Sequence, residues 1–274
     1  MPFSMGGMLF CLGTDGGAVS MESLSLSVVI ITLNEEANLS RTLASVAGAD
    51  EIVVLDSGST DRTREVAESF HARFFVEPWK GFAAQKNSAL SKATGDWILS
   101  LDADEEVEPG LADEIRSMMI ADPSVAGFWV PRKNFFLGRW IRHGGFYPDR
   151  KLRLFRRGSG SFEDRLVHED LKLDGATSSL YNHLLHHAYP TLESYIEHMN
   201  RYSSLGAQVA VAKRPHGFSL VDILIRPKFT FLYNYFLRLG FLDGREGLLL
   251  HAYHAAYVSW KYAKAWELGR KKRP

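Results

Sequence analysis

Two aspartates separated by a single residue, Asp102 and Asp104, directly follow the apolar run 97–101. Ionised carboxylates beside a buried strand are costly unless a cation neutralises them. Carboxylate oxygens are the ligands that Mg²⁺ and Mn²⁺ prefer, and Mg²⁺ usually keeps water ligands and binds substrate phosphates. The pair therefore predicts a divalent cation that carries a diphosphate, with one carboxylate able to meet a ribose hydroxyl. A solvated acidic turn that includes Glu105 and Glu106 is the alternative.

Polar residues also close two earlier apolar runs. Thr32 and Glu35 lie at the end of the run 27–32, and Asp56 and Asp61 lie at the end of the run 51–56. Ligands of parallel sheets bind beyond the carboxyl ends of the strands, so the three clusters are expected to share one crevice. Plainer roles remain for each of them: a strand-end turn for Thr32, an exposed carboxylate for Glu35, and a capping side chain in its loop for Asp56.

These clusters require an alternation of strands and helices. The β-branched and apolar runs predict strands at 27–32, 51–56, 73–76, 97–101, 125–131 and 152–155, and the intervening patterns predict helices at 36–46, 62–70, 82–93 and 111–119. Strands joined by helices of about ten residues form right-handed βαβ units. The expected fold class is α/β, with a mostly parallel, Rossmann-like sheet flanked by helices and a C-terminal helical appendage.

The chain is expected to divide into three parts. Its 274 residues, 46% of them hydrophobic, can bury a sizeable core. We expect a disordered extension at 1–24, with Met21 as an alternative translation start, an α/β domain at 25–190 and a helical region at 191–274. Cys11 is the only cysteine, which excludes an intramolecular disulfide and fits a reducing, cytoplasmic location.

Four sequence blocks, at 28–36, 52–63, 85–90 and 95–104, resemble the successive motifs of glycosyltransferase family 2. The resemblance is dense over residues 26–110 and continues more loosely to about residue 190. It implies a GT-A fold and an inverting transfer of a sugar, a hexose in our interpretation, from a nucleoside diphosphate sugar such as a UDP-sugar. It also implies that a carboxylate deprotonates the acceptor hydroxyl, which attacks the anomeric carbon while the nucleoside diphosphate leaves.

The resemblance assigns roles residue by residue. Donor-binding residues would be Thr32, Glu35 and Asp56 at the base and ribose, Asp61 in support of them, Lys86 near the nucleotide or its phosphates, and Asp102 at the ribose or the metal. Asp104 would be the principal ligand of Mg²⁺ or Mn²⁺. Relatives often carry arginine at the position of Lys86, so a lysine ammonium replaces a planar guanidinium that can form two parallel hydrogen bonds. A lysine on a helix surface is the alternative for Lys86.

The family usually supplies the catalytic base from a later acidic motif. Glu169 is the favoured base, Asp170 is its nearest rival, and Asp164 is third. His168 could complete the metal shell or orient a phosphate, as a later histidine does in some GT-A enzymes, and an ordinary loop histidine is its alternative. A zinc site made of His168, His183, His186 and His187 is disfavoured, because the spacing is not a recognised ligand pattern and adjacent residues of a strand point to opposite faces.

The acceptor is expected to be a glycan or glycolipid. Segments 130–134, 138–142, 165–169 and 240–244 resemble bacterial enzymes that add glucose to the inner core of lipopolysaccharide. Arg150 and Arg153 belong to a cationic segment, 147–157, that could contact acceptor phosphates. The solvent face of an alternating strand is the other interpretation of this segment.

The C-terminal region is basic and aromatic. Residues 214–274 carry 11 Lys and Arg against 4 Asp and Glu, whereas residues 1–213 have a net charge of −7. Such a helical segment suits an anionic membrane surface, and no run is long enough to span a bilayer. We expect peripheral contact with the cytoplasmic face of the inner membrane and no nucleic-acid partner. A helical hairpin that packs against the α/β domain is the alternative.

Two other functions remain in competition with glycosyl transfer. A sugar-nucleotidyltransferase needs a glycine-rich loop after the first strand to bind a triphosphate, and the loop 33–38 contains no glycine. A non-catalytic protein that binds nucleotide sugars or acts as a scaffold would keep the fold without turnover. Donor hydrolysis separates an enzyme from such a scaffold.

Overall fold

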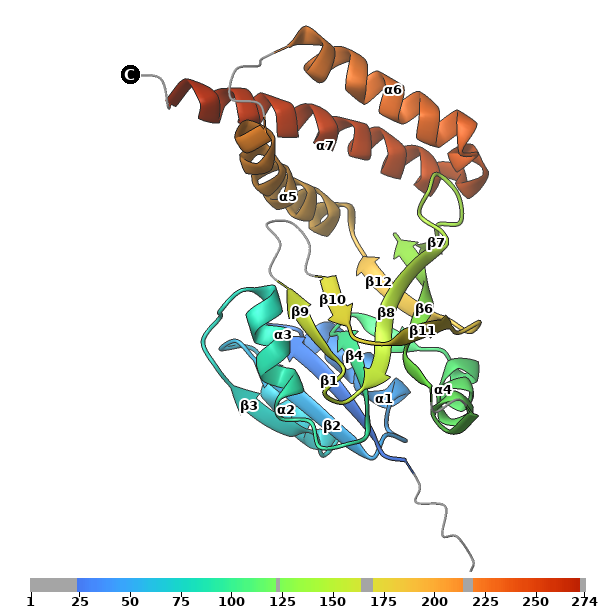
Figure 1. Cartoon of the computed structure of the whole chain (residues 1–274). Coiled ribbons are helices and arrows are strands. Elements are labelled where there is room, and N and C mark those ends of the chain that lie inside the picture. Colours follow the sequence, from blue (N-terminus) through green and yellow to red (C-terminus); the bar gives the residue numbers. More distant parts are fainter. Residues whose placement is uncertain (1–23, 122–123, 164–169, 214–218, 272–274) are drawn as a thin grey trace, which may run out of the picture.

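The computed structural model describes residues 24–121, 124–163, 170–213 and 219–271. Within these ranges the chain is a mixed α/β structure with one large curled sheet and a group of helices beside it (Figure 1). The strands precede the long helices, since the last strand ends at Tyr189 and the next helix begins at Leu192. The predicted extension at 1–24 falls outside the described residues except for residue 24.

The first half of the sheet follows the sequence prediction closely. Strands β1 (Leu26–Thr32), β2 (Glu51–Asp56), β3 (Arg73–Val76) and β4 (Trp97–Asp102) lie parallel in the order β3-β2-β1-β4. They alternate with helices α1 (Glu36–Ser45), α2 (Thr63–Ser69) and α3 (Phe82–Leu90). The predicted βαβ units are therefore confirmed, although α3 ends three residues before the expected Ala93. The chain turns there toward Gly95, where a side chain would collide with Ser27 of β1.

The second half of the sheet is more irregular. Helix α4 (Pro109–Ala121) is followed by β6 (Val125–Phe136), β8 (Asp149–Arg156) and β12 (Leu184–Tyr189), which extend the sheet in the order β4-β8-β6-β12. Short strands complete it: β5 (Glu105–Val107) pairs with β12, and both β7 (Arg139–Trp140) and β11 (Ala176–Ser179) pair with β6. Strands β9 (Gly160–Glu163) and β10 (Asp170–Leu173) form a separate antiparallel pair.

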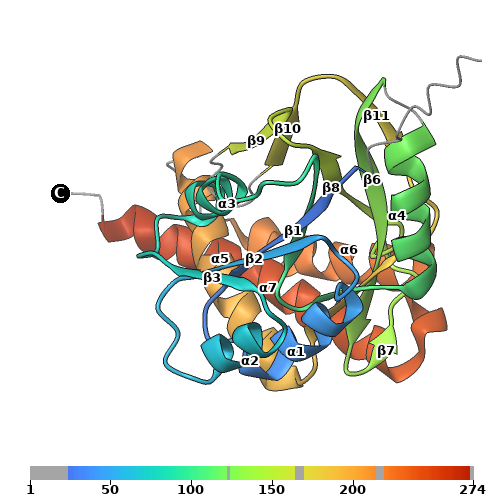
Figure 2. The same cartoon turned by 90° about the horizontal axis from the view of Figure 1, so that it is seen from below.

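Apolar side chains cover both faces of the sheet. On one face, residues of β1, β2 and β4 pack against α1 and α4, with Leu39, Leu43, Leu111 and Ile115 fully or almost fully buried. On the other face, Val29, Val53 and Ile98 pack against α3 and Phe155. Figure 2, viewed along a perpendicular direction, shows α3 and α4 beside the strands that they cover. This core fixes the strand ends from which the polar residues project.

The C-terminal part of the chain is helical, as predicted. It contains α5 (Leu192–Lys213), η1 (Val221–Ile225), α6 (Arg226–Leu232), η2 (Tyr233–Leu237), η3 (Gly240–Asp243) and α7 (Gly244–Lys271). Helix α6 lies farthest from the sheet, with α7 beside it (Figure 1). A small cluster that includes Phe136, Ile141, Tyr195 and Leu250 joins this part to the sheet. No helix among the described residues has the length and hydropathy of a membrane span.

Candidate functional site

The strand register brings the predicted polar clusters to one edge of the sheet. Thr32 at the end of β1 lies opposite Asp56 at the end of β2, and Ile31 lies opposite Asp102 at the end of β4. Three parallel strands therefore end side by side with a polar residue at or beside each end. The carboxyl edge is where parallel sheets bind their ligands, so this edge is the candidate site.

Asp56 is held tightly by its own loop. Its Oδ1 accepts a hydrogen bond of 3.0 Å from the Thr32 hydroxyl, and its Oδ2 accepts bonds of 2.7 Å from the backbone N–H groups of Gly58 and Ser59. Gly58 has a φ of 100°, a conformation that side chains disfavour and that turns these N–H groups toward the carboxylate. Asp56 therefore stabilises its own loop and does not cap α2, which begins at Thr63, so the helix-capping alternative is wrong. The residue is 2% exposed.

Glu35 and Asp61 organise the helices that begin at this edge. Asp61 accepts hydrogen bonds from the backbone N–H of Glu36 and from Thr63, whose hydroxyl accepts a bond from the backbone N–H of Glu35. The Glu35 carboxylate accepts a bond of 3.0 Å from Asn38. Burial raises the pKa of Glu35, and the negative charges of Asp104 and Asp102 raise it further, against the effect of Asn38. The Glu35 side chain therefore lies within the electrostatic range of both aspartates.

Asp102 is paired with two cations. Lys86 Nζ lies 3.0 Å from Asp102 Oδ1, and Arg153 donates a hydrogen bond to Asp102 Oδ2. Burial alone would raise the pKa of Asp102, but the charges of Arg153 and Lys86 outweigh burial and hold it well below its ordinary value. Lys86 is only 4% exposed, so the alternative of a helix-surface lysine is wrong.

A buried chain of alternating charges continues from Asp102 into the sheet. Glu105 is fully buried and accepts hydrogen bonds of 2.7 Å from both Arg153 and Arg132. Arg132 also bonds to Asp149, at 2.7 Å from Oδ2. Burial would raise the pKa of Asp149, but Arg132 and Lys151 lower it to about 2. Of the acidic run 102–106, Glu105 thus points into the sheet, and the alternative of a wholly solvated acidic turn is wrong.

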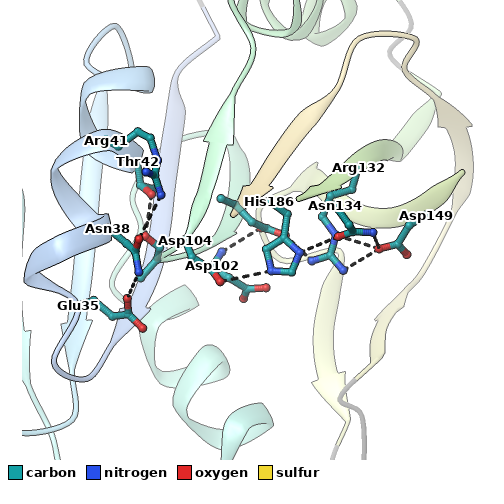
Figure 3. A network of polar contacts seen from close by, with 12 residues as sticks. Glu35, Asn38, Arg41, Thr42, Asp102, Asp104, Arg132, Asn134, Asp149 and His186 are labelled. Carbon is teal, nitrogen blue, oxygen red and sulfur yellow. Dashed lines mark hydrogen bonds and ion pairs between the residues drawn. The ribbon is translucent and has the colours of Figure 1, made fainter. Parts of the chain in front are cut away.

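Asp104 has a different partner. His186 on β12 places Nε2 3.3 Å from Asp104 Oδ2, and the backbone carbonyl of Asp104 accepts a bond from the N–H of His187 (Figure 3). Burial would raise the pKa of Asp104, but the hydrogen bond and charge of His186 lower it. Asp104 therefore faces an imidazole, whereas Asp102 faces an ammonium and a guanidinium.

Asn134 fixes the orientation of the His186 ring. The Asn134 Nδ2 group donates to the Phe146 carbonyl at 3.2 Å and to Asp149 Oδ2 at 3.1 Å, so its Oδ1 faces His186 Nδ1 at 2.7 Å (Figure 3). An amide oxygen accepts, so His186 Nδ1 carries the proton. Nε2 is then left toward Asp104, where it either donates a second proton or shares a cation with the carboxylate. Histidines that bind metals commonly donate their other N–H in this way.

These residues fit a divalent cation that is completed by its substrate. Among the described residues, no group of three or more His, Cys, Asp or Glu side chains could enclose a metal. Mg²⁺ does not require such a cage, because it is usually bound by one or two carboxylates together with waters and substrate phosphates. Asp104 with His186 Nε2 meets that requirement at the open edge. Asp102 is less suited to it, since its two oxygens already contact cations.

The candidates for the catalytic base lie mostly in a part of the chain about which the structure gives no detail. Glu169, His168 and Asp164 fall outside the described residues. Asp170 is exposed at the start of β10 and pairs with Glu163 of β9. Phe162 of β9 lies close to the site, because Lys86 Nζ is 5.2 Å from the centre of its ring and Asn87 bonds to its backbone.

The two acceptor candidates on β8 point in opposite directions. Arg153 is 6% exposed and contacts Asp102 and Glu105, whereas Arg150 is exposed and its guanidinium lies 3.5 Å from the Ser179 hydroxyl. The solvent-face interpretation of this strand is therefore wrong for Arg153. Its guanidinium is occupied by two carboxylates, which corrects the expectation of an arginine that is open to acceptor phosphates.

Sequence reasoning did not assign Glu105, Arg132, Asn134 or His186 to the site. Arg132 could be suspected only because it is a charged residue inside an apolar run, and Glu105 belongs to the acidic run 102–106, where nothing in the local sequence distinguishes it from its neighbours. His186 was considered only for zinc. The expected divergence of neighbouring strand residues does hold, because His186 faces Asp104 while His187 lies 3.1 Å from Glu106.

Comparison with known proteins gives matches over most of the chain. The lipopolysaccharide core biosynthesis glycosyltransferase LpsC of Rhizobium meliloti (strain 1021) is 33% identical over 253 residues, which cover 89% of this chain and 93% of LpsC. The structure of S. aureus TarS 1-349 in complex with UDP-GlcNAc matches with a TM-score of 0.49 and 17% identity, over 90% of each chain.

A third protein matches over a shorter stretch. Glucosyl-3-phosphoglycerate synthase from Mycobacterium tuberculosis, in complex with Mn²⁺, UDP and glucosyl-3-phosphoglycerate, is 26% identical with a TM-score of 0.35. That match covers 41% of this chain and 44% of the synthase, so this chain spans less than half of it. The family model for glycosyl transferase family 2 matches residues 27–183, which include the carboxyl ends of β1, β2 and β4. The chain therefore belongs to glycosyl transferase family 2, with a GT-A fold and a role in glycosyl transfer.

Proposed function

We propose that this chain transfers a hexose, with inversion, from a nucleoside diphosphate sugar to a hydroxyl of a glycolipid or glycan. The observation that carries the proposal is the carboxyl edge of the sheet, where Asp104 faces His186 while Asp102 is held by Lys86 and Arg153. The edge thus offers separate places for a metal, a diphosphate and a nucleoside. A UDP-sugar is the proposed donor.

The nucleoside would bind at the ends of β1 and β2. Thr32, Glu35 and Asp56 would hold the base and ribose, and Asp61 would keep the two helix starts in place. Asp56 already accepts hydrogen bonds from Thr32 and two backbone N–H groups. We infer that its preformed loop presents Ser57 and Gly58 to the base, with Asp56 as the residue that fixes their conformation.

The diphosphate would lie between Lys86, Asp102 and Asp104. Bound there, Mg²⁺ or Mn²⁺ would neutralise the charge that develops on the leaving diphosphate. Asp104 would be its principal ligand, and His186 Nε2 would be a second ligand beside it. His168 stays a prediction, because it lies outside the described residues. Asp102, restrained by Lys86 and Arg153, would accept a hydrogen bond from a ribose hydroxyl. Lys86 would keep its charge close to the phosphates.

The acceptor hydroxyl would be activated by a carboxylate of the β9–β10 region. Its oxygen forms a bond to the anomeric carbon, its proton passes to the carboxylate, and the bond between that carbon and the diphosphate oxygen breaks. Glu169 is our first choice for this base and Asp170 the second. Support comes from the contact of Phe162, just before this stretch, with Lys86.

The proposed acceptor is a phosphorylated, membrane-anchored glycan of the lipopolysaccharide inner core. The similarity to LpsC, named as a lipopolysaccharide core biosynthesis glycosyltransferase, supports this class of acceptor. Arg150, which is exposed, remains the residue proposed to contact acceptor phosphates. Such an acceptor implies a place at the cytoplasmic face of the inner membrane.

A donor screen tests the proposal. Purified protein is mixed with each member of a panel of nucleotide sugars, with Mn²⁺, with Mg²⁺ or with EDTA, and release of nucleoside diphosphate is followed with and without a deacylated core oligosaccharide. We expect release from one donor that requires the metal, increases with the acceptor and gives an inverted linkage. Donor binding without turnover on any acceptor would favour the scaffold, and pyrophosphate release from a nucleoside triphosphate with a sugar phosphate would favour the nucleotidyltransferase.

A further inference from the structure

Large apolar side chains are unusually exposed on the outermost helical segment. Of the 22 exposed large hydrophobic residues within the described ranges, 12 lie between Leu220 and Leu242. Neither η1, α6 nor η2 contains a buried residue. Monomeric soluble proteins rarely expose contiguous apolar patches of more than a few hundred Å², so a concentration of this kind marks an interaction surface.

The exposed residues form one face. Val221, Ile225, Phe229, Leu232 and Phe236 follow one another at intervals of three or four residues, the spacing of a single helix side. Phe229 is 63% exposed, and Leu237 at the end of the segment is 73% exposed. The apolar face of 220–242 is therefore exposed. Figure 1 shows that α6, which carries part of this face, is the helix farthest from the sheet.

The opposite side of the segment is fixed to α7. The Ser259 hydroxyl donates to the Ile223 carbonyl at 3.2 Å, and the Arg226 guanidinium lies 3.4 Å from the Tyr262 hydroxyl. Arg226 also pairs with Asp222 one turn earlier. Among the aromatic residues, Phe231 and Tyr235 lie on the less exposed side and stack on each other at 5.1 Å. The segment therefore has an inner side that packs against α7 and an apolar outer side.

A cationic hollow adjoins the apolar face. It has a volume of about 470 Å³, and its lining includes Arg142, His143, Leu237, Arg238 and Leu239. Two of these residues, Leu237 and Leu239, are also exposed members of the apolar stretch. Apolar and cationic groups are thus continuous at this point, as an interface with lipid chains and phosphate headgroups requires.

The two guanidinium groups of the hollow are available for an anion. Arg142 stacks over Trp140 at 4.1 Å and Arg238 over Tyr233 at 4.9 Å, and within the described ranges neither forms an ion pair. Their backbones are held in place, since the N–H groups of Arg142 and His143 donate to buried Asp243 and the Gly144 N–H donates to the Arg238 carbonyl at 2.9 Å. Lys228 and Arg245 add exposed positive charge nearby in the sequence.

We propose that the apolar face of 220–242 and the Arg142–Arg238 hollow form one docking surface for a bilayer that contains anionic phospholipids. The apolar side chains would enter the acyl boundary, and the two arginines would contact headgroup phosphates. A second copy of the chain fits less well, because two such faces would bring the unpaired arginines together. The surface needs neither donor nor acceptor, so its test is independent of the transferase assay.

Vesicle flotation tests the surface. Full-length protein is floated with vesicles of phosphatidylethanolamine and phosphatidylglycerol, or of phosphatidylcholine alone, and its mass is measured separately by light scattering. We expect binding to the anionic vesicles that falls as salt rises. The double substitution Arg142→Ser with Arg238→Ser should weaken that binding by about fivefold for each arginine, and Phe229→Ser with Phe236→Ser should weaken it whatever the salt.

Matched controls replace exposed residues elsewhere. Two double variants should bind vesicles like the wild type: Arg62→Ser with Arg64→Ser at the start of α2, and Ile120→Ser with Tyr181→Ser on the α/β part. Circular dichroism verifies the fold of each variant. The proposal is overturned if wild-type protein does not float with anionic vesicles, or if neither double substitution weakens flotation. It is also overturned if the wild type is a dimer that does not float and Phe229→Ser with Phe236→Ser makes it monomeric.

Discussion

Asp102 and Asp104 are two residues apart, yet their surroundings give them different chemistry. Asp102 is neutralised by Lys86 and Arg153, so a metal ion would bind less strongly there than at a carboxylate without such partners. Asp104 has His186 as its side-chain partner, and the Nε2 atom of that ring is a good metal ligand once its proton is absent. We therefore assign the metal to Asp104 with His186, and a positioning role at the ribose to Asp102.

The role of His186 can be separated from that of its neighbour on β12. Replacing His186 with Phe should raise the Mn²⁺ concentration needed for half-maximal binding by at least the roughly 10- to 100-fold that is typical when a partner of a metal ligand is lost. Titration of the protein with Mn²⁺ and UDP, followed by electron paramagnetic resonance, measures this directly. His187→Phe is the control, since His187 faces Glu106. Equal effects of the two substitutions would contradict the assignment.

The raised pKa of Glu35 predicts that the stability of the folded chain depends on pH. Burial and the charges of Asp104 and Asp102 raise the pKa of Glu35 in the folded chain. The contribution of protonated Glu35 to the free energy of unfolding is therefore fully present below the ordinary pKa of 4.5, and it is lost as pH rises through the folded pKa. Glu35→Gln should therefore increase the urea midpoint at pH 7.5 and leave it almost unchanged at pH 4. A gain of the same size at both values would show that the charge is not the cause.

Among the elements, β8 carries one arginine inside the protein and another at the surface. Alternation along β8 places Arg153 inside, between Asp102 of β4 and Glu105 of β5, and leaves Arg150 exposed. Arg132 on the adjacent β6 repeats the arrangement with Glu105 and Asp149. Buried ion pairs of this kind add little net stability, but losing one partner leaves an uncompensated charge. The charges therefore hold the ends of these strands in register at the site.

A pair of substitutions on β8 tests this arrangement. Arg153→Met should lower the free energy of unfolding by roughly 3–5 kcal/mol, because Asp102 and Glu105 lose a shared partner inside the protein. Arg150→Met, three residues earlier on the same strand, should change it by no more than about 0.5 kcal/mol. Urea denaturation of both variants gives the comparison. If the two variants lose similar stability, the buried charges do not support the strand ends as described.

The elements differ in how well the sequence predicts them. β1, β2 and β4 are runs of β-branched and leucine residues, and helices follow them at regular intervals, so these units were predicted almost to the residue. β5 has three residues, two of them glutamates, and β7 has only two residues. Short polar strands of this kind form because a neighbour offers backbone hydrogen bonds, which no local pattern encodes.

The same distinction applies to the site. Thr32, Asp56 and Asp102 lie at strand ends, where the order of the motifs reveals them. His186 lies about 80 residues after Asp104, and it reaches that aspartate only because β12 pairs with both β5 and β6. Such proximity follows from tertiary structure, so a sequence can list the histidine but cannot place it. Glu169 and His168 stay predictions, since they lie outside the described residues.

At the scale of the whole molecule, the helical part is attached to the sheet through a small junction. Tyr195 of α5 and Leu250 of α7 pack with Phe136 and Ile141 at the end of the sheet. A cavity of about 190 Å³ borders this junction, and its lining includes His186, Asn134, Asp149 and Leu250. Asn134 and Asp149, which orient His186, thus line the same cavity as Leu250 of α7. A change in the packing of α7 should therefore change the orientation of the His186 ring.

Half-buried histidines make this helical part sensitive to acid. Burial lowers the pKa of His254 to about 4, with further lowering by His251 and Lys261, and burial and Arg201 lower the pKa of His198 to about 4. Their contribution to stability is present above the ordinary value of 6.5 and is lost as pH falls from there through 4. At 1.36 kcal/mol per unit, His254 accounts for no more than about 3 kcal/mol of that loss.

Thermal denaturation between pH 7 and pH 4 measures this sensitivity. His254→Phe should reduce the fall of the melting temperature over that interval, because its side chain has no charge to acquire. His71→Asn, at an exposed histidine in the turn before β3 with a φ of 56°, is the control and should follow the wild type. A His254→Phe variant with the full wild-type fall would show that other groups carry the acid sensitivity.

We propose Asp104 as the metal-holding carboxylate of a glycosyl transfer site. The most direct test of this claim is the rate of metal-dependent release of nucleoside diphosphate by Asp104→Asn, beside Asp113→Asn at an exposed position of α4. Loss of the ligand should cost on the order of 100-fold or more in turnover, above the 10- to 100-fold of outer-shell changes, while Asp113→Asn should equal the wild type. Turnover by a correctly folded Asp104→Asn variant at the wild-type rate and Mn²⁺ dependence would contradict the claim.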